Sequence, residues 1–260
     1  MTRTFTVVAM MVTAALGAGS AAQAQTATQG ARQGLEATWS ADVAIGWDNS
    51  ISGNINSSAI GRLNDTPVVI TKNSYESVYG TGLHFRFGGG YMLNEVLELR
   101  ATFSFQSLDA DLTRMGDYGA SNLYGQYQDY QSLALDFGLR HYHRVSPKLR
   151  AYGEGEIGIA VIDETDVFLS APAADFAGRA SDFYDRTAAF AFGINAGLLY
   201  QTHERVGVYG QVGLRWMTGM SAVDQFEDAS LDTINDKSAR TTFPFLLVVR
   251  FGFGNGFGEP

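Results

Sequence analysis

Between Leu97 and Gln106, apolar and polar side chains alternate without a single exception. One series is apolar throughout, and the other contains the charged residues Glu98 and Arg100. Because successive side chains of a β-strand point to opposite faces, this segment predicts a strand with one apolar and one charged face. Such a strand must separate an apolar environment from a charged one, which restricts the folds open to the chain.

The same alternation recurs in seven further segments, so the chain has eight predicted strands. The further segments are Ala37–Trp47, Val78–Tyr91, Gln131–Tyr142, Leu149–Val161, Ala188–Tyr200, Val206–Met217 and Thr241–Phe253. Short turns alternate with polar connections of roughly 20 to 30 residues, as in outer-membrane barrels with short periplasmic turns and long extracellular loops. We therefore predict an all-β fold, an eight-stranded antiparallel up-and-down transmembrane β-barrel. Ten strands remain an alternative if Pro67–Thr71 forms a hairpin in the first long connection.

The first 24 residues have the features of a cleaved secretion signal. Arg3 provides a positive start, Phe5–Leu16 is apolar, and Ala22–Ala24 forms an A-x-A cleavage site. The apolar run is shorter than the roughly 20 residues that a membrane helix needs. We divide the chain into a signal peptide (1–24), a flexible lead-in (25–35), an outer-membrane barrel domain (36–254) and a C-terminal tail (255–260).

The composition excludes several classes of function. A net charge of −9 argues against nucleic acid as a partner, because an acidic chain lacks the positive footprint that binds phosphates. The chain has no cysteine, which rules out disulfides and thiolate metal sites.

The polar faces of the predicted strands carry charges of both signs. The interior of an eight-stranded barrel is only wide enough for side chains to fill, and buried charges need partners. We therefore predict a lumen plugged by paired charges; a narrow ion path through the same charges is the alternative. The predicted lumen charge network comprises Arg86, Glu98, Arg100, Asp136, Arg140, Glu154, Glu156, Arg215 and Arg250.

Aromatic residues fall near the outward ends of the predicted strands. Amphipathic rings favour the boundary between hydrocarbon and water, so these positions are typical of the aromatic girdles of membrane proteins. The predicted interfacial aromatics are Trp39, Trp47, Tyr79, Tyr91, Tyr200 and Trp216.

The remaining candidate residues for chemistry have simpler explanations. His141 and His143 share one strand face, but they lie beside a predicted turn with no carboxylate on that face, so we expect an interfacial position. His84 is predicted to face the lumen beside Arg86. The acidic clusters of the long connections lack the glycine and glutamate spacing of a Ca²⁺ loop. We expect no catalytic residue, no metal site and no cofactor, since common nucleophile and metal motifs do not occur.

With these features the chain resembles the small eight-stranded outer-membrane proteins of Gram-negative bacteria, the OmpA-like and opacity-type β-barrel domains of the porin family. The resemblance covers Ala37 to Phe253. It implies a place in the bacterial outer membrane, with outer-membrane lipids and lipopolysaccharide around the barrel and the outer-membrane assembly machinery as a partner. Such proteins commonly end on an aromatic residue that this machinery reads. Here residues follow Phe253, so either Phe253 or Phe257 is the expected signal.

The sequence predicts a monomeric, non-enzymatic barrel whose surface loops serve adhesion or envelope integrity, through contact with an extracellular ligand or a host surface. A narrow porin-like channel for ions or small solutes is the alternative. A lipid-modifying enzyme is disfavoured, because the predicted outward face lacks a nucleophile and base in register.

Overall fold

The computed structural model describes residues 35–203, 205–221, 230–231 and 234–257. The predicted signal peptide, and all of the lead-in except Leu35, lie outside the described residues. No helix in these ranges is long and apolar enough to cross a membrane.

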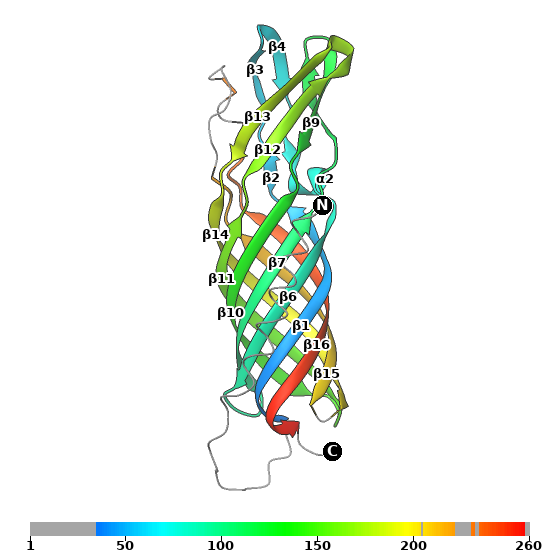
Figure 1. Ribbon diagram of the computed structural model, residues 1–260, viewed down its shortest axis with the longest axis vertical. Coiled ribbons are helices and arrows are strands. Elements are labelled where there is room, and N and C mark those ends of the chain that lie inside the picture. Colours follow the sequence, from blue (N-terminus) through cyan, green and yellow to red (C-terminus); the bar gives the residue numbers. More distant parts are fainter. Residues whose placement is uncertain (1–34, 204, 222–229, 232–233, 258–260) are drawn as a thin grey trace.

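Eight long strands form a closed antiparallel barrel (Figure 1). In their order around the barrel they are β1 (Leu35–Ser52), β16 (Arg240–Phe257), β15 (Val206–Met217), β14 (Thr187–His203), β11 (Leu149–Ile162), β10 (Tyr130–Arg144), β7 (Leu97–Leu108) and β6 (Thr81–Met92). Each of the eight predicted segments is one of these strands, so the predicted fold class is confirmed. The strands have 12 to 18 residues, more than the roughly 9 to 11 that cross a bilayer.

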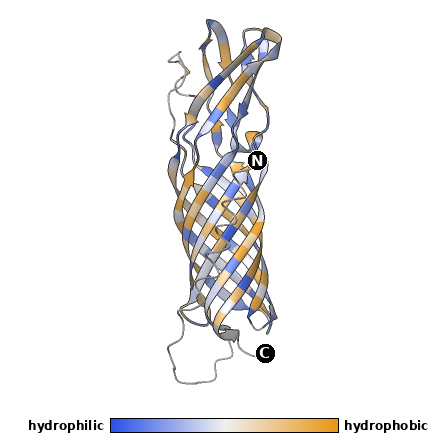
Figure 2. Ribbon diagram, viewed as in Figure 1, coloured by the Kyte–Doolittle hydropathy of each residue, from blue (hydrophilic) through white to orange (hydrophobic). Residues whose placement is uncertain are grey.

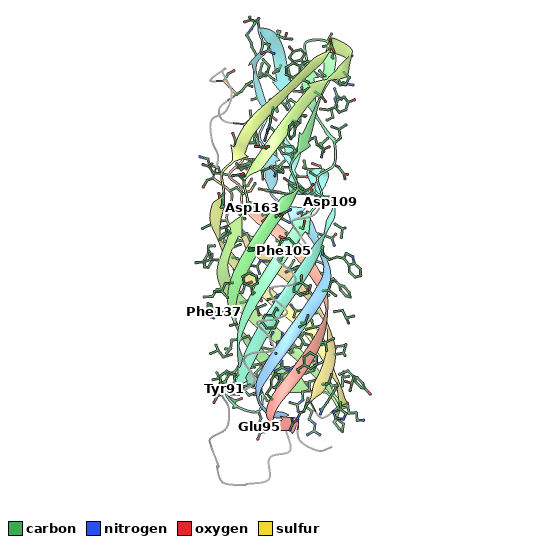
Figure 3. The ribbon with its side chains drawn as sticks, in the orientation of Figure 1. Tyr91, Glu95, Phe105, Asp109, Phe137 and Asp163 are labelled. Atoms are coloured by element: carbon green, nitrogen blue, oxygen red, sulfur yellow. The ribbon has the colours of Figure 1, made fainter. Side chains whose placement is uncertain are left out.

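Hydrophobic and hydrophilic residues alternate along the barrel strands (Figure 2), and the burial of their side chains shows an apolar outer face and a charged inner face. On β10, the outward Phe137 is 55% exposed, whereas the neighbouring Asp136 is 1% exposed. Figure 3 shows Phe137 pointing away from the barrel wall. A closed barrel satisfies the backbone hydrogen bonds between strands, which allows this apolar face to lie in lipid.

At the end of the barrel that carries the long connections, which the sequence predicts to be extracellular, the chain continues as a second, smaller β-structure (Figure 1). A six-stranded sheet has the order β13 (Phe176–Tyr184), β12 (Thr165–Ala171), β9 (Ser121–Tyr127), β8 (Thr113–Tyr118), β4 (Thr66–Ile70) and β3 (Ala59–Leu63). Near its base lie the strand pair β2 (Asn54–Asn56) and β5 (Asn73–Ser74) and the short helix α2 (Tyr75–Val78), while the 3₁₀ turn η2 (Pro172–Ala174) joins β12 to β13. We call this structure the extracellular extension.

The extracellular extension has a hydrophobic core of its own. Ile55, Met115, Leu123, Val167 and Phe183 are fully buried in it. The sequence analysis treats these segments only as long polar connections, and it does not foresee that they fold. The hairpin near Pro67, which the sequence analysis gives as an alternative, does form, as β3 and β4. It joins the extension, so the barrel keeps eight strands.

Two predicted boundaries differ from the structure. Residues near the start of the second predicted strand form helix α2 instead, with Ser74 as its N-cap in a capping box, and the strand begins at Thr81. At the other end of the chain, β16 continues to Phe257, which pairs with Leu35 of β1. Residues 255–257 of the predicted tail are therefore part of the barrel wall.

Candidate functional site

All nine residues of the predicted lumen charge network lie on the inner face of the barrel, each no more than 6% exposed. They come from six different strands, because the alternation places every second residue of each strand inside. The structure separates them into two clusters along the barrel axis. The cluster nearer the short turns, which we call the periplasmic cluster after the side predicted for those turns, consists of Glu98, Arg100, Arg140, Glu154 and Arg250, together with Asp42 of β1.

Arg100 is the centre of the periplasmic cluster. Its guanidinium contacts Asp42, and its Nε lies 3.2 Å from Glu154 Oε1. Arg140 reaches the other oxygen of the same carboxylate, with Nη2 2.6 Å from Glu154 Oε2. Arg140 and Glu154 are direct cross-strand partners, so the register of β10 and β11 sets this pair.

Glu98 has the densest set of partners in the lumen. Tyr142 donates its hydroxyl hydrogen to Glu98 Oε2 at 2.7 Å, and Ser40 donates to Oε1 at 2.7 Å. Arg250 Nη1 donates to Oε2 at 3.0 Å, while its Nη2 contacts Oε1, which makes the pair bidentate. Charge-assisted bidentate pairs of this kind are among the strongest hydrogen bonds in proteins.

Three tyrosines fill the lumen around the periplasmic cluster. Tyr209 donates to Asp42 Oδ2 at 2.8 Å, and Tyr152 donates to Gln211 Oε1 at 2.9 Å. The guanidinium carbon of Arg140 lies 4.0 Å from the centre of the Tyr152 ring, within cation–π range. Together with Tyr142, these rings occupy the periplasmic half of the barrel interior.

The extracellular cluster lies nearer the other end and consists of Arg86, Asp136, Glu156 and Arg215. Arg215 binds Asp136 through two parallel hydrogen bonds, each of 2.9 Å. Its Nη1 also lies 3.3 Å from Glu156, and Arg86 donates to the same carboxylate at 2.6 Å. Gly193 leaves room for the Glu156 side chain, because a Cβ at that position would lie within 3 Å of Glu156 Oε1 and Cγ.

Polar residues also close the lumen where it meets the extracellular extension. Asp48 accepts hydrogen bonds from Gln106 and Thr242, and His84 Nδ1 lies 3.5 Å from it. Arg240 donates to Ser50, and its guanidinium carbon lies 4.2 Å from the centre of the Tyr130 ring. The predicted inward position of His84 agrees with this arrangement.

The buried charges of the inner face balance. Six arginines face six carboxylates, and the carboxylates are Asp42, Asp48, Glu98, Asp136, Glu154 and Glu156. A cavity of about 10 Å³, lined among others by Asp42, Arg86 and Gln211, lies between the two clusters. That volume has room for about one water molecule. The described inner face therefore carries buried charges whose formal sum is zero.

Sequence reasoning missed Asp42, Asp48 and Arg240. Asp42 and Asp48 lie on the polar series of β1 and could have been found from the alternation alone, because Trp39, Val43 and Trp47 define its outer face. Arg240 is the first residue of β16, one position before the predicted start of that strand.

Five of the six predicted interfacial aromatics lie on the outer face. Their exposed fractions range from 38% to 57%, and they are Trp39, Trp47, Tyr91, Tyr200 and Trp216. Trp39 and Tyr91 contact each other at the periplasmic end, with ring centres 4.7 Å apart.

Tyr79 was wrongly predicted as an interfacial aromatic. It is 1% exposed, stacks on Tyr75 and donates its hydroxyl hydrogen to the Gln128 carbonyl. The reason is that the chain turns inward through helix α2 immediately before Tyr79, which breaks the alternation that the prediction extended to this residue.

No family model and no curated protein matches the chain. Solved structures match it at low identity. Neisserial surface protein A is 11% identical with a TM-score of 0.43, over 84% of this chain and 98% of that one. The outer membrane protein OprG from Pseudomonas aeruginosa is 12% identical with a TM-score of 0.41, over 85% and 98%. The outer membrane protein AlkL is 13% identical with a TM-score of 0.36, over 92% and 100%. In its closed eight-stranded barrel, the chain is similar to the small outer-membrane β-barrel proteins, as its sequence predicts.

Proposed function

We propose that this protein is a non-conducting barrel of the bacterial outer membrane that holds a folded β-sheet at the cell surface, for adhesion or for envelope integrity. The single observation that supports this proposal best is the lumen, where six arginines and six carboxylates are buried together. A plugged barrel serves as an anchor, and the part that it anchors is the extracellular extension.

The extension supports a binding role, because its sheet is held in one shape. Its buried core and its pairing between strands of different connections fix the exposed outer face. On that face Phe168 is 47% exposed beside Arg179, whose guanidinium carbon lies 5.1 Å from the ring centre. Aromatic and arginine side chains are enriched at protein interfaces, so we propose an extracellular ligand or host surface as the partner.

In the membrane, the barrel is proposed to act as a monomer surrounded by outer-membrane lipids and lipopolysaccharide. The outward apolar face supports this arrangement, with exposed residues such as Ile45, Leu135 and Ile159 along its length. The proposal also includes export through the cleaved signal peptide, insertion by the outer-membrane assembly machinery with Phe253 or Phe257 as its signal, and a role without catalysis.

Planar-bilayer recording on the purified, folded protein tests the plugged lumen. We expect no stable conductance steps at either polarity. A stable conductance would contradict the plug. If that conductance changed its ion selectivity in the R86Q and E156Q variants, it would establish the alternative, a narrow channel through the extracellular cluster.

Replacement of residues 59–70 by a two-residue turn tests the surface role. This change removes hairpin β3–β4 and leaves all eight barrel strands. We expect normal insertion into the outer membrane but reduced attachment of cells to a surface, or increased sensitivity to detergents. Unchanged attachment and unchanged detergent resistance would contradict a role for the extension.

A further inference from the structure

The charge of the chain is distributed unevenly along the barrel axis. The connections at the extracellular end, residues 53–80, 109–129, 163–186 and 218–239, contain 17 acidic and 6 basic residues. The inner face of the barrel is balanced. At the periplasmic end the balance is reversed: residues 92–97, 144–150 and 203–206 together contain four basic and two acidic residues.

These four cations form what we call the basic rim, namely Arg144, Lys148, Arg150 and Arg205. Arg144 is the last residue of β10, Lys148 lies in the β10–β11 turn, and Arg150 is the second residue of β11. Arg205 lies in the β14–β15 turn. The two connections are neighbours, because β11 pairs with β14 and the Gln201 amide donates to the Lys148 carbonyl at 2.9 Å. Three of the four side chains are exposed and Arg150 is half-buried. The four cations therefore lie at the same end of four adjacent strands.

The rim has no close anionic partner in the described part of the protein, although Glu95 of the β6–β7 turn acts electrostatically on Arg150. Arg144 and Arg150 are direct cross-strand partners, an arrangement in which like charges repel each other. None of the four cations forms an ion pair with a residue that the structure describes. An external anion would relieve this repulsion, whereas in the lumen the protein supplies its own carboxylates.

The depth of the rim limits which anion can reach it. Both connections are tight: the Val145 amide donates to the Leu149 carbonyl, and β15 begins three residues after β14 ends. Apolar side chains accompany the cations, with Val145 56% exposed and Tyr200 50% exposed on the outer face. The headgroup layer extends for about 5 to 7 Å beyond the hydrocarbon. Turns this short keep the cations within that layer.

We propose that the basic rim binds the anionic phosphate headgroups of phospholipids in the periplasmic leaflet of the membrane. Arginine guanidinium groups match phosphate oxygens with two parallel hydrogen bonds, and lysine adds a compact charge. The rim thus recruits negatively charged lipid to one side of the barrel, below β10, β11, β14 and β15.

Electron paramagnetic resonance of spin-labelled lipids tests this proposal. The full folded protein is reconstituted in phosphatidylcholine vesicles with a trace of spin-labelled phosphatidylglycerol or, in parallel, spin-labelled phosphatidylcholine. We expect phosphatidylglycerol to associate severalfold more strongly at low salt, because a basic residue near an anionic surface contributes about fivefold in affinity. In 0.5 M NaCl the preference should shrink.

The variant R144Q/K148Q/R150Q/R205Q removes the rim, and K72Q/R114Q/R186Q/K237Q is its matched control, with the same charge removed from the extracellular segments. We expect the first variant to lose the preference and the control to keep it, with both folded by circular dichroism. Absence of a preference in the wild type, or equal loss in both variants, would overturn the proposal. Retention of the wild type by insoluble peptidoglycan without any lipid preference would assign the rim to the cell wall and also overturn it.

Discussion

Glu98 shows how a single carboxylate is stabilised inside this barrel. It is fully buried, and it accepts hydrogen bonds from Ser40, Tyr142 and Arg250, while Arg100 Nη1 lies 3.6 Å away. An isolated ion in such a place would be very unfavourable, so its stability depends on the whole set of partners. The same side chain belongs to the alternating segment whose polar face first indicated a charged interior.

Removal of the Glu98 charge should destabilise the barrel strongly. In E98Q, Arg250 loses its only described carboxylate within 4 Å, and breaking a buried pair costs about 3–5 kcal/mol. Equilibrium unfolding in urea, followed by tryptophan fluorescence in detergent micelles, measures this loss. The exposed pair of Arg114 and Asp117 provides a control, where R114Q should cost less than about 1 kcal/mol. Equal effects of both substitutions would contradict a charge-stabilised lumen.

Two glycines of the wall provide a second test at single residues. A methyl group at Gly193 would collide with Glu156, whereas one at Gly155 would meet no described atom within 4 Å. G193A should therefore cost about 1–3 kcal/mol in the same unfolding experiment, as overpacking does in a filled interior. G155A should leave the stability nearly unchanged. A G193A variant as stable as G155A would show that the extracellular cluster adapts freely.

At the level of elements, the barrel strands and the extracellular strands differ in how far they can be predicted. Barrel strands keep a period of two over 12 or more residues. Each pairs with the barrel strands next to it in chain order, and β1 and β16 pair to close the barrel. The strands of the six-stranded sheet in the extension have only 5 to 9 residues, and several pair with strands from another connection. Val68 of the first connection pairs with Tyr118 of the second, and Val167 of the third pairs with Tyr127 of the second. Such pairings depend on the barrel bringing distant segments together, so the local pattern could not reveal them.

The predicted inward charges illustrate the same point. Their side of the wall followed from the alternation, but their partners did not, since Arg250 and Glu98 come from strands that are not neighbours. The prediction that Tyr79 faces outward failed for a different reason, because a single helical turn interrupts the alternation just before the strand begins.

The turn between β3 and β4 gives a test of how firmly the extension is held. Asn64 and Asp65 have φ values of 48° and 60°, the positive values of a type I′ hairpin turn, in which glycine is favoured at the second position. D65G should stabilise the hairpin by roughly 1 kcal/mol, and D65V should destabilise it by a similar amount or more. Hydrogen exchange of the β3 and β4 amides measures both. Effects of the same sign would contradict this turn assignment.

At the level of the whole molecule, charge and shape define an axis. The acidic extension lies at one end, the neutral filled lumen in the middle and the basic rim at the other end. Figure 3 places Tyr91 and Glu95 at the periplasmic end of the barrel and Asp109 and Asp163 at the junction with the extension.

This axis predicts a single orientation in the cell. An epitope tag inserted between Asn64 and Asp65 should be labelled by antibody on intact cells, because it lies at the tip of an extracellular hairpin. A tag inserted after Pro147, in the β10–β11 turn, should be labelled only after the outer membrane is made permeable. Labelling of the second tag on intact cells would show the reverse orientation.

The seam between β1 and β16 joins the two ends of the described chain, and each of these strands contributes a charge whose partner lies on β7. Asp42 arrives with β1 and contacts Arg100, while Arg250 arrives with β16 and binds Glu98. A sheet that lacks either terminal strand therefore keeps an unneutralised ion next to hydrocarbon. We expect such truncated or half-folded chains not to insert stably into the bilayer. Pairing of β1 with β16 would then be a condition for stable insertion.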